Sequence, residues 1–291
     1  MNKGIKSEVS PFAKGVTMSR FYVSPESVKD KKIYVEKKES HHIIDVMRLQ
    51  EGDSVTAFDG AGKEYEGRIA AIKNKKVIID IFRAKTVDKK LPVSVSIAQA
   101  MPKKGKMDLI IQKVTELGVD EIFPVESSRT VVKTKTERSR HKIERWQKIA
   151  IEASKQCGRT ELPKVQDITY FDEMLACMDR YDLTIMPCLS EGTITLKSAL
   201  KDIKRPNKVL VIIGPEGDFS KEEIKKASEK GAVLVTLGEL ILKSDTAAIA
   251  TISVLNHEFT PLESPALQGG DEVMYNSGFL KKGRGIKPRP F

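Results

Sequence analysis

The 291-residue sequence has little cysteine and no long apolar run. Its three cysteines, Cys157, Cys177 and Cys188, are odd in number and widely spaced, which argues against a disulfide framework and against a zinc-ribbon spacing. We therefore expect a reducing, cytoplasmic setting. Because no stretch of 18 apolar residues occurs, no membrane span is predicted, and the charged first seventeen residues do not read as a secretory signal.

Two common nucleotide-binding loops are also missing. The sequence contains neither G-x-G-x-x-G nor G-x-x-x-x-G-K-[ST], which counts against a Rossmann NAD enzyme and a P-loop NTPase. The neighbours His41 and His42 have no further ligands near them in the sequence, and on a strand or helix they would point in different directions. We expect no metal site.

Positive charge is what the sequence has in excess. Lysine and arginine number 50 against 40 acidic residues, for a formal charge of +10. This surplus favours a polyanionic partner, either nucleic acid or an anionic membrane. A solvated surface of mixed charge explains the composition equally well, so charge alone does not decide.

The chain divides into four stretches by pattern. Residues 1–17 form an N-terminal extension, and residues 18–88 are rich in β-branched and aromatic residues with turn signals between them, which predicts a small β-barrel or sandwich. A charged linker ends at Pro92. Residues 92–259 alternate apolar strand-like runs with amphipathic helical ones, which predicts an α/β domain with a mostly parallel sheet. Residues 260–291 are rich in Pro, Gly and Ser and predict a basic flexible tail.

Several elements of the α/β stretch can be bounded from pattern alone. The sequence predicts strands at 93–98, 121–125, 183–187 and 209–213, and helices at 106–117, 140–157, 195–204, 220–230 and 244–259. Ser220 and Glu223 form a capping-box pattern that fixes the start of one helix.

Two strand-to-helix loops are the strongest candidates for chemistry. The first runs from Ile213 through Gly-Pro-Glu-Gly to Ser220, and the second from Val235 to Ala248. In open α/β sheets, ligands bind just beyond the carboxyl ends of the strands, and glycines let the backbone approach them closely. Both loops could instead be purely structural, with Ser244 or Thr246 as a helix N-cap.

The order of motifs resembles one family over about residues 18–259. The sequence has Arg-Phe-Tyr-Val at 20–23, His-His at 41–42, Gln-Lys-Val-Thr-Glu-Leu-Gly at 112–118, Glu-Ala-Ser-Lys-Gln-Cys-Gly-Arg at 152–159 and Ile-Gly-Pro-Glu-Gly at 213–217. In this it is similar to the bacterial 16S ribosomal RNA (uracil-N3) methyltransferases of RsmE type, in the SPOUT superfamily.

The resemblance implies a fold, a cofactor and partners. It implies a PUA-like β-barrel for RNA, then a SPOUT-type α/β domain with a parallel sheet and a trefoil knot. It also implies a homodimer that methylates N3 of a uridine in 16S ribosomal RNA of the 30S subunit, with S-adenosyl-L-methionine as cofactor and no metal or membrane partner. The implied cofactor-binding residues are Ile213, Gly214, Pro215, Glu216, Gly217, Leu237, Gly238, Leu242, Thr246 and Ala247.

The same resemblance, together with charge, suggests catalytic and RNA-binding residues. Loss of the N3 proton makes the base anionic, and a nearby cation would stabilise it; Arg159 is the candidate cation and Glu216 a candidate proton acceptor. Arg159 could instead serve only as a cation at a helix end. The expected RNA contacts are Arg20, Arg48, Arg129, Lys133 and Arg159.

The sequence departs from the family pattern at four loop positions. The family usually has glycine at Asp218, arginine at Leu240 and Lys243, and glutamate at Asp245. Leucine cannot donate a hydrogen bond, and lysine lacks the bidentate fork of arginine. An alternative therefore remains beside the active enzyme, namely a catalytically weakened relative that binds RNA or the ribosome.

Overall fold

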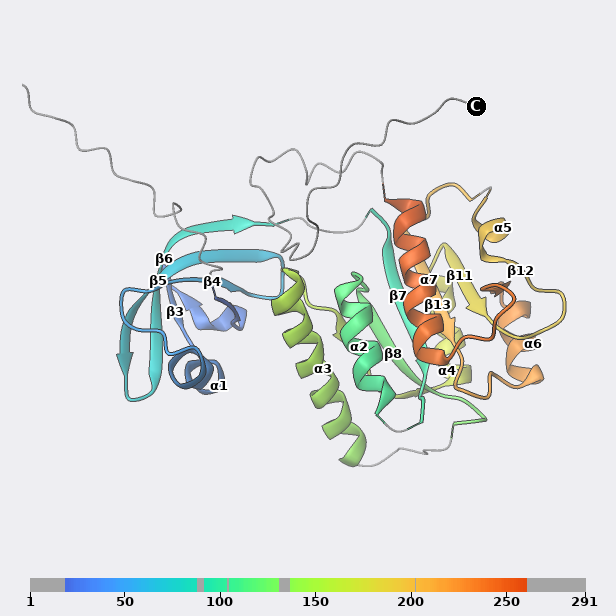
Figure 1. Cartoon of the computed structure of the whole chain (residues 1–291), viewed down its shortest axis with the longest axis horizontal. Coiled ribbons are helices and arrows are strands. Elements are labelled where there is room, and N and C mark those ends of the chain that lie inside the picture. The colour runs from blue at the N-terminus through green and yellow to red at the C-terminus, as the bar shows by residue number, and fades with distance from the viewer. Residues whose placement is uncertain (1–18, 88–91, 104, 131–136, 202, 261–291) are drawn as a thin grey trace, which may run out of the picture.

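In a computed structural model, the chain forms two lobes that lie next to each other (Figure 1). The structure describes residues 19–87, 92–103, 105–130, 137–201 and 203–260. The predicted extension, the predicted tail beyond Thr260 and the expected RNA contact Lys133 lie outside these residues.

The first lobe is a six-stranded sheet with the strand order β1-β4-β5-β6-β3-β2. Its strands are β1 (Arg20–Tyr22), β2 (Val28–Lys29), β3 (Lys32–Tyr34), β4 (Ser54–Phe58), β5 (Lys63–Lys73) and β6 (Lys76–Thr86). The short helix α1 (Lys37–His41) and the π-helical turn η2 (His42–Val46) follow β3, and the 3₁₀ helix η1 (Pro25–Ser27) precedes β2. Only β1 and β4 pair in parallel; the other pairs are antiparallel.

One face of this sheet forms the core of the lobe. Side chains alternate between the two faces of a strand, so Ile33, Val77 and Ile79 point inward and pack against Ile43 of η2. One of the turns between these strands is at Asp59, whose carboxylate accepts hydrogen bonds from the backbone N–H groups of Ala61 and Lys63. The expected small β domain is thus present.

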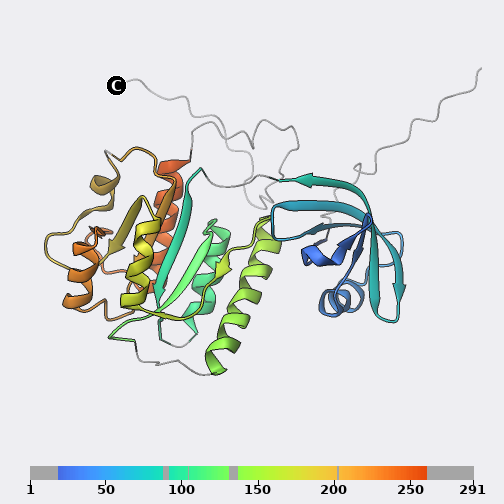
Figure 2. The same cartoon turned by 180° about the vertical axis from the view of Figure 1, so that it is seen from behind.

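The second lobe is a parallel sheet covered by helices on both faces (Figures 1 and 2). The strand order is β10-β8-β7-β13-β11-β14-β12, with β9 paired to β8. The strands are β7 (Ser94–Ala100), β8 (Glu121–Glu126), β9 (Lys164–Val165), β10 (Thr169–Tyr170), β11 (Leu183–Pro187), β12 (Ile194–Thr195), β13 (Lys208–Ile213) and β14 (Val233–Thr236).

Alternation along the central strands divides the core into two layers. Val209, Val211 and Ile213 of β13 pack with the helices α2 (Lys106–Glu116), α3 (Glu137–Cys157), α5 (Leu196–Leu200) and α7 (Ser244–Phe259). Leu210 and Ile212 face the opposite layer, which contains α4 (Phe171–Leu175), η3 (Ala176–Arg180) and α6 (Lys221–Glu229). The predicted α/β architecture with a parallel sheet is confirmed; the trefoil knot and the exact domain boundaries stay predictions.

Two local predictions need correction. The helix expected over 195–204 is shorter: Thr195 is its N-cap and it ends at Leu200, a few residues before Pro206, which cannot continue a helix. The N-cap of α7 is Lys243, and neither Ser244 nor Thr246 takes that position. The capping box of Ser220 and Glu223 forms as predicted, with the Glu223 backbone N–H donating to Ser220 Oγ at 3.2 Å.

Candidate active site

Three neighbouring parallel strands end at one pocket. Strands β13, β11 and β14 are adjacent in the sheet, so their carboxyl ends and the loops that follow them lie at the same edge. The pocket is lined by residues of all three loops and of the start of α7: Pro187, Cys188, Leu189, Ile213, Gly214, Pro215, Glu216, Asp218, Val235, Thr236, Leu237, Gly238, Leu240, Ile241, Leu242, Ser244 and Ala247. This is the place at which open α/β sheets bind ligands.

Most of the residues expected to bind the cofactor meet here. Ile213, Gly214, Pro215, Glu216, Leu237, Gly238, Leu242 and Ala247 all line the pocket. Gly217 belongs to the same loop but faces a neighbouring hollow, and Thr246 is exposed on the first turn of α7. The roles of these residues stay predictions, although the two loops do form the walls of a single pocket.

The loop after β13 is held by hydrogen bonds to the start of α7. Ser244 Oγ donates to the carbonyl oxygen of Gly214 at 2.5 Å, and Gln99 Nε2 donates to the same hydroxyl at 2.9 Å. All three residues are buried. This chain of bonds fixes one wall of the pocket against the other.

Glu216 is anchored as an ionised group. Burial by itself would raise the pKa of Glu216, but hydrogen bonds from the Lys103 backbone and from Lys106 outweigh it, and the pKa lies below its usual range. Both carboxylate oxygens accept from the Lys103 N–H at 3.1 Å. A carboxylate with a lowered pKa is a weak base, so the geometry favours a loop-positioning role over the expected proton acceptor.

Asp218 connects two loops in a strained conformation. Its φ of 60° lies in the left-handed region, which glycine adopts without strain. Its carboxylate accepts from the backbone N–H groups of Phe219 and of Leu189, both at 2.8 Å. The residue therefore ties the loop after β13 to the loop after β11, and the hydrogen bonds offset the cost of its φ.

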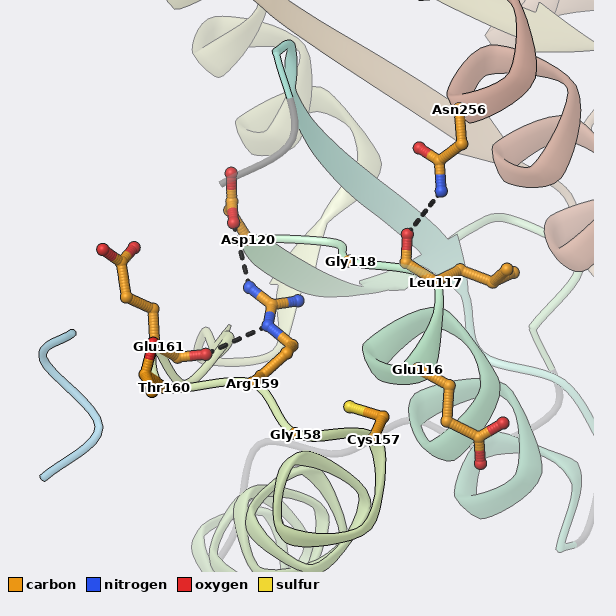
Figure 3. A pocket seen from close by; sticks show the side chains of 10 residues that line it. All are labelled: Glu116, Leu117, Gly118, Asp120, Cys157, Gly158, Arg159, Thr160, Glu161 and Asn256. Atoms are coloured by element: carbon orange, nitrogen blue, oxygen red, sulfur yellow. Dashed lines mark hydrogen bonds and ion pairs between the residues drawn. The ribbon is translucent and has the colours of Figure 1, made fainter. Parts of the chain in front are cut away.

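Arg159 lies at the other end of the second lobe. A hollow of about 280 Å³ opens where α2 and α3 end and α7 approaches its end, lined by Arg159, Asp120 and Asn256, among others (Figure 3). Asn256 stands twelve residues after Ser244 on α7, which is about 18 Å along a helix. Within one chain, therefore, Arg159 is not brought to the pocket that contains Glu216.

The guanidinium of Arg159 is already engaged. It donates to Asp120 Oδ1 and to the carbonyl oxygen of Glu161, both at 3.0 Å (Figure 3). It also donates to the carbonyl oxygen of Val119 at 2.6 Å. These bonds tie the end of α3 to the start of β8. They give Arg159 a structural role in the single chain, while its catalytic role stays a prediction without support from this geometry.

The other expected RNA contacts differ in accessibility. Arg48 is exposed, whereas Arg129 Nη1 donates to the carbonyl oxygen of Gly217 at 2.5 Å and so supports the pocket loop. Arg20 is largely buried: its guanidinium lies 3.9 Å from the Phe58 ring centroid and pairs with Glu64 at 3.3 Å. Of these three arginines, only Arg48 has a side chain that makes no hydrogen bond or ion pair with another described residue.

Sequence reasoning missed the third wall of the pocket. Pro187 ends β11, and Cys188 and Leu189 follow it; the sequence did predict this strand. The missing information was the strand order, because β11 lies between β13 and β14 in the sheet but precedes both in the chain. Burial, and to a lesser extent the charge of Asp218, raise the pKa of the Cys188 thiol to about 11.

Among the residues that the structure describes, no group of three or more His, Cys, Asp or Glu side chains could hold a metal ion. No helix in that part of the chain is long and apolar enough to cross a membrane.

Comparisons with known proteins match both lobes. Residues 89–256 match the model of an RNA methyltransferase domain, and residues 35–82 match that of an RNA methyltransferase PUA domain. Ribosomal RNA small subunit methyltransferase E of Bacillus subtilis is 32% identical over 225 residues, which cover 76% of this chain and 88% of that protein.

Two similar solved structures extend over nearly the whole described chain. A putative methyltransferase of Legionella pneumophila, in complex with the bound cofactor SAM, is 32% identical with a TM-score of 0.76, covering 83% of this chain and 98% of that one. A ribosomal RNA small subunit methyltransferase E of Neisseria gonorrhoeae, bound to S-adenosyl methionine, is 30% identical with a TM-score of 0.75, covering 84% and 100%.

Proposed function

We propose a methyl-transfer function for this chain, which belongs to the RsmE-type family of ribosomal RNA methyltransferases. The enzyme transfers the methyl group of S-adenosylmethionine to N3 of a uridine in 16S ribosomal RNA of the small subunit. The observation that carries the proposal is the pocket at the ends of β13, β11 and β14, in a fold shared with two relatives that hold S-adenosylmethionine. Such a substrate implies action in the cytoplasm.

The residues of the pocket suit this cofactor. Leu237, Leu242 and Ala247 offer apolar surface, and the loop backbones offer polar groups. Gly238 has a φ of 129°, and a Cβ built on it would meet no atom within 4 Å. A side chain there would project into open space, so glycine leaves backbone accessible to a ligand.

The chemistry requires little from the protein beyond position and electrostatics. S-adenosylmethionine supplies an activated methyl group on a sulfonium, so no side chain has to form a covalent intermediate. The hydrogen bonds of Ser244 and Asp218 join the loops and so fix the positions of the pocket walls relative to one another. Among the described residues that line the pocket none is a lysine or an arginine, and Lys106 beside it is paired with Glu216 at 3.3 Å and with Asp245 at 3.8 Å.

A homodimer would supply the missing parts of the site. The first lobe and the strand β11, whose end contributes to the pocket, lie toward opposite ends of the molecule in both views (Figures 1 and 2). Apolar side chains are exposed in the pocket loop and on the nearby helices: Leu240 (81%), Ile241 (76%), Val254 (43%) and Leu109 (42%). We therefore propose that a second copy covers this surface and brings its own cations to the pocket. Light scattering that shows only monomer at micromolar concentration would contradict this.

The weakened-relative alternative depends on the loop departures. Asp218 does not close the pocket, because its carboxylate is directed to backbone N–H groups and the residue lines the rim. The structure therefore offers a reason why a residue other than glycine is tolerated there. Leu240 and Lys243 remain the positions at which catalysis could be reduced.

Calorimetry with S-adenosylmethionine tests the proposal. The wild type is expected to bind with one site per chain, and Ala247→Phe, whose larger side chain would occupy the pocket, should abolish binding. His257→Ala, exposed near the far end of the same helix, is the matched control and should bind normally. A folded wild-type protein that shows no heat of binding would refute the cofactor site.

A further inference from the structure

The outer face of the first sheet carries two exposed aromatic rings. Tyr34 on β3 and Phe82 on β6 are 49% and 58% exposed. Because Ile33 and Ile79 point into the core, their strand neighbours point to the opposite face. Tyr34 pairs with Ile78, and Phe82 follows four residues later, so the rings lie about 13 Å apart along the strand.

A β-bulge directs Phe82 outward. Glu66 pairs with Arg83 and Gly67 with Ile81, which leaves Phe82 as the extra, unpaired residue of β6. A Cβ on Gly67 would lie 2.6 Å from the carbonyl oxygen of Asp80, so only glycine permits the strands to approach in this way. Bulges of this kind are used to re-aim a side chain.

Cations lie around the two rings on the same face. Register places Lys32 and Arg68 opposite Asp80, and Lys32 pairs with Asp80 at 3.3 Å. The other carboxylates of this face, Glu64 and Glu66 on β5, both pair with Lys85 further along β6. The cations of this face are Lys29, Lys32, Arg68, Lys73 and Lys76. We define the aromatic face as Tyr34, Phe82, Lys32 and Arg68.

We propose that the aromatic face binds a single-stranded segment of RNA, with one base stacked on each ring and the cations on its phosphates. Exposed rings interleaved with cations are what sequence-tolerant single-strand binding requires, since every base has a face that can stack. A paired helix hides its base faces and could not use the two rings. This inference rests on the proposed function for the identity of the nucleic acid.

Fluorescence anisotropy with a labelled 12-nucleotide single-stranded RNA tests the face. Phe82→Ala and Tyr34→Ala should each weaken binding about tenfold, which is about 1.4 kcal/mol and within the range for one stacked base. Phe82→Trp should retain binding, which separates stacking from a folding defect. Arg68→Gln should lower the slope of log affinity against log salt by about 0.7. Met47→Ala, exposed in the same lobe but outside the sheet, is the control.

The outcomes separate this inference from the proposed function. Calorimetry of the same variants with S-adenosylmethionine should match the wild type, because the face lies on the other lobe. If the enzyme methylates ribosomal RNA but both alanine variants bind the single strand as well as wild type, the face is wrong and the function stands. If an RNA duplex of the same sequence binds as tightly as the single strand and loses as much affinity in the variants, stacking is also refuted.

Discussion

Arg20 Nη2 donates a hydrogen bond to the carbonyl oxygen of Arg159 at 2.7 Å, across the boundary between the two lobes. Its Nη1 donates to the carbonyl oxygen of Ser154 at 3.0 Å, so a side chain of β1 caps the end of α3. Arg159 in turn binds the start of β8. The two arginines therefore form a continuous link from the first lobe to the sheet that carries the pocket.

We expect Arg20→Ala to destabilise the protein by about 1–3 kcal/mol, because two partly buried carbonyl groups lose a charged donor. Urea denaturation measures the free energy of unfolding. Arg48→Ala, which removes an exposed arginine of the same lobe, should change it by less than about 0.5 kcal/mol. Equal effects of the two substitutions would show that the link contributes nothing to stability.

The pH dependence of stability should report on Glu64. Burial by itself would raise its pKa, but Lys85 and Arg20 outweigh burial and lower the pKa from its ordinary value of 4.5. A carboxyl group with a lowered folded pKa stabilises the fold above its unfolded pKa, and this contribution is lost as pH falls through the folded pKa. Unfolding free energy should therefore fall below about pH 4.5, and less steeply in Glu64→Gln. An unchanged slope in that variant would contradict the assignment.

The features of the fold and of the site that could be predicted are those that depend on residues close together in the sequence. The capping box at Ser220 and the bounds of α7 follow from neighbouring residues, and both strand-end loops were found from their glycines and apolar runs. The wall after β11 was missed because strand order is a tertiary property. The expectation that Arg20 and Arg159 contact RNA came from the family resemblance together with charge, and neither can show that backbone carbonyl groups already accept hydrogen bonds from both side chains.

We expect Asp218→Gly to weaken S-adenosylmethionine binding about tenfold, because the loop after β13 loses its bond to Leu189. Asp218→Asn should act similarly, since the amide can replace one acceptor but not both. Calorimetry measures the affinity. If Asp218→Gly binds more tightly than wild type, strain at this residue outweighs the bonds that it makes.

Cys188 offers a second readout of the same loop. Its thiol pKa is raised to about 11 by burial first and by Asp218 next, so alkylation by iodoacetamide at pH 8 should be slow. Asp218→Asn removes the charge, lowers the pKa and should speed alkylation, whereas bound S-adenosylmethionine should slow it. Mass mapping of the alkylated cysteine, with Cys177 as internal control, decides the outcome. A rate that neither the substitution nor the cofactor changes would place Cys188 outside the pocket.

Restoring arginine at Leu240 and Lys243 tests the departures from the family pattern. Both side chains are exposed, so the larger side chains fit without repacking the core. The double variant should raise the single-turnover methylation rate by one to two decades, which is about 1.5–3 kcal/mol for one charged contact, with little change in cofactor affinity. A wild type that already equals the variant would show that another residue carries this role.

The most direct test of the central claim is mass spectrometry of small-subunit RNA after reaction with S-adenosylmethionine that carries an isotopically labelled methyl group. Undermethylated 30S subunits are the substrate, and Ala247→Phe is the control. The account predicts a labelled N3-methyluridine at one position with the wild type and none with the control. Label on another base or another atom, or no label with a wild type that binds the cofactor, would contradict it.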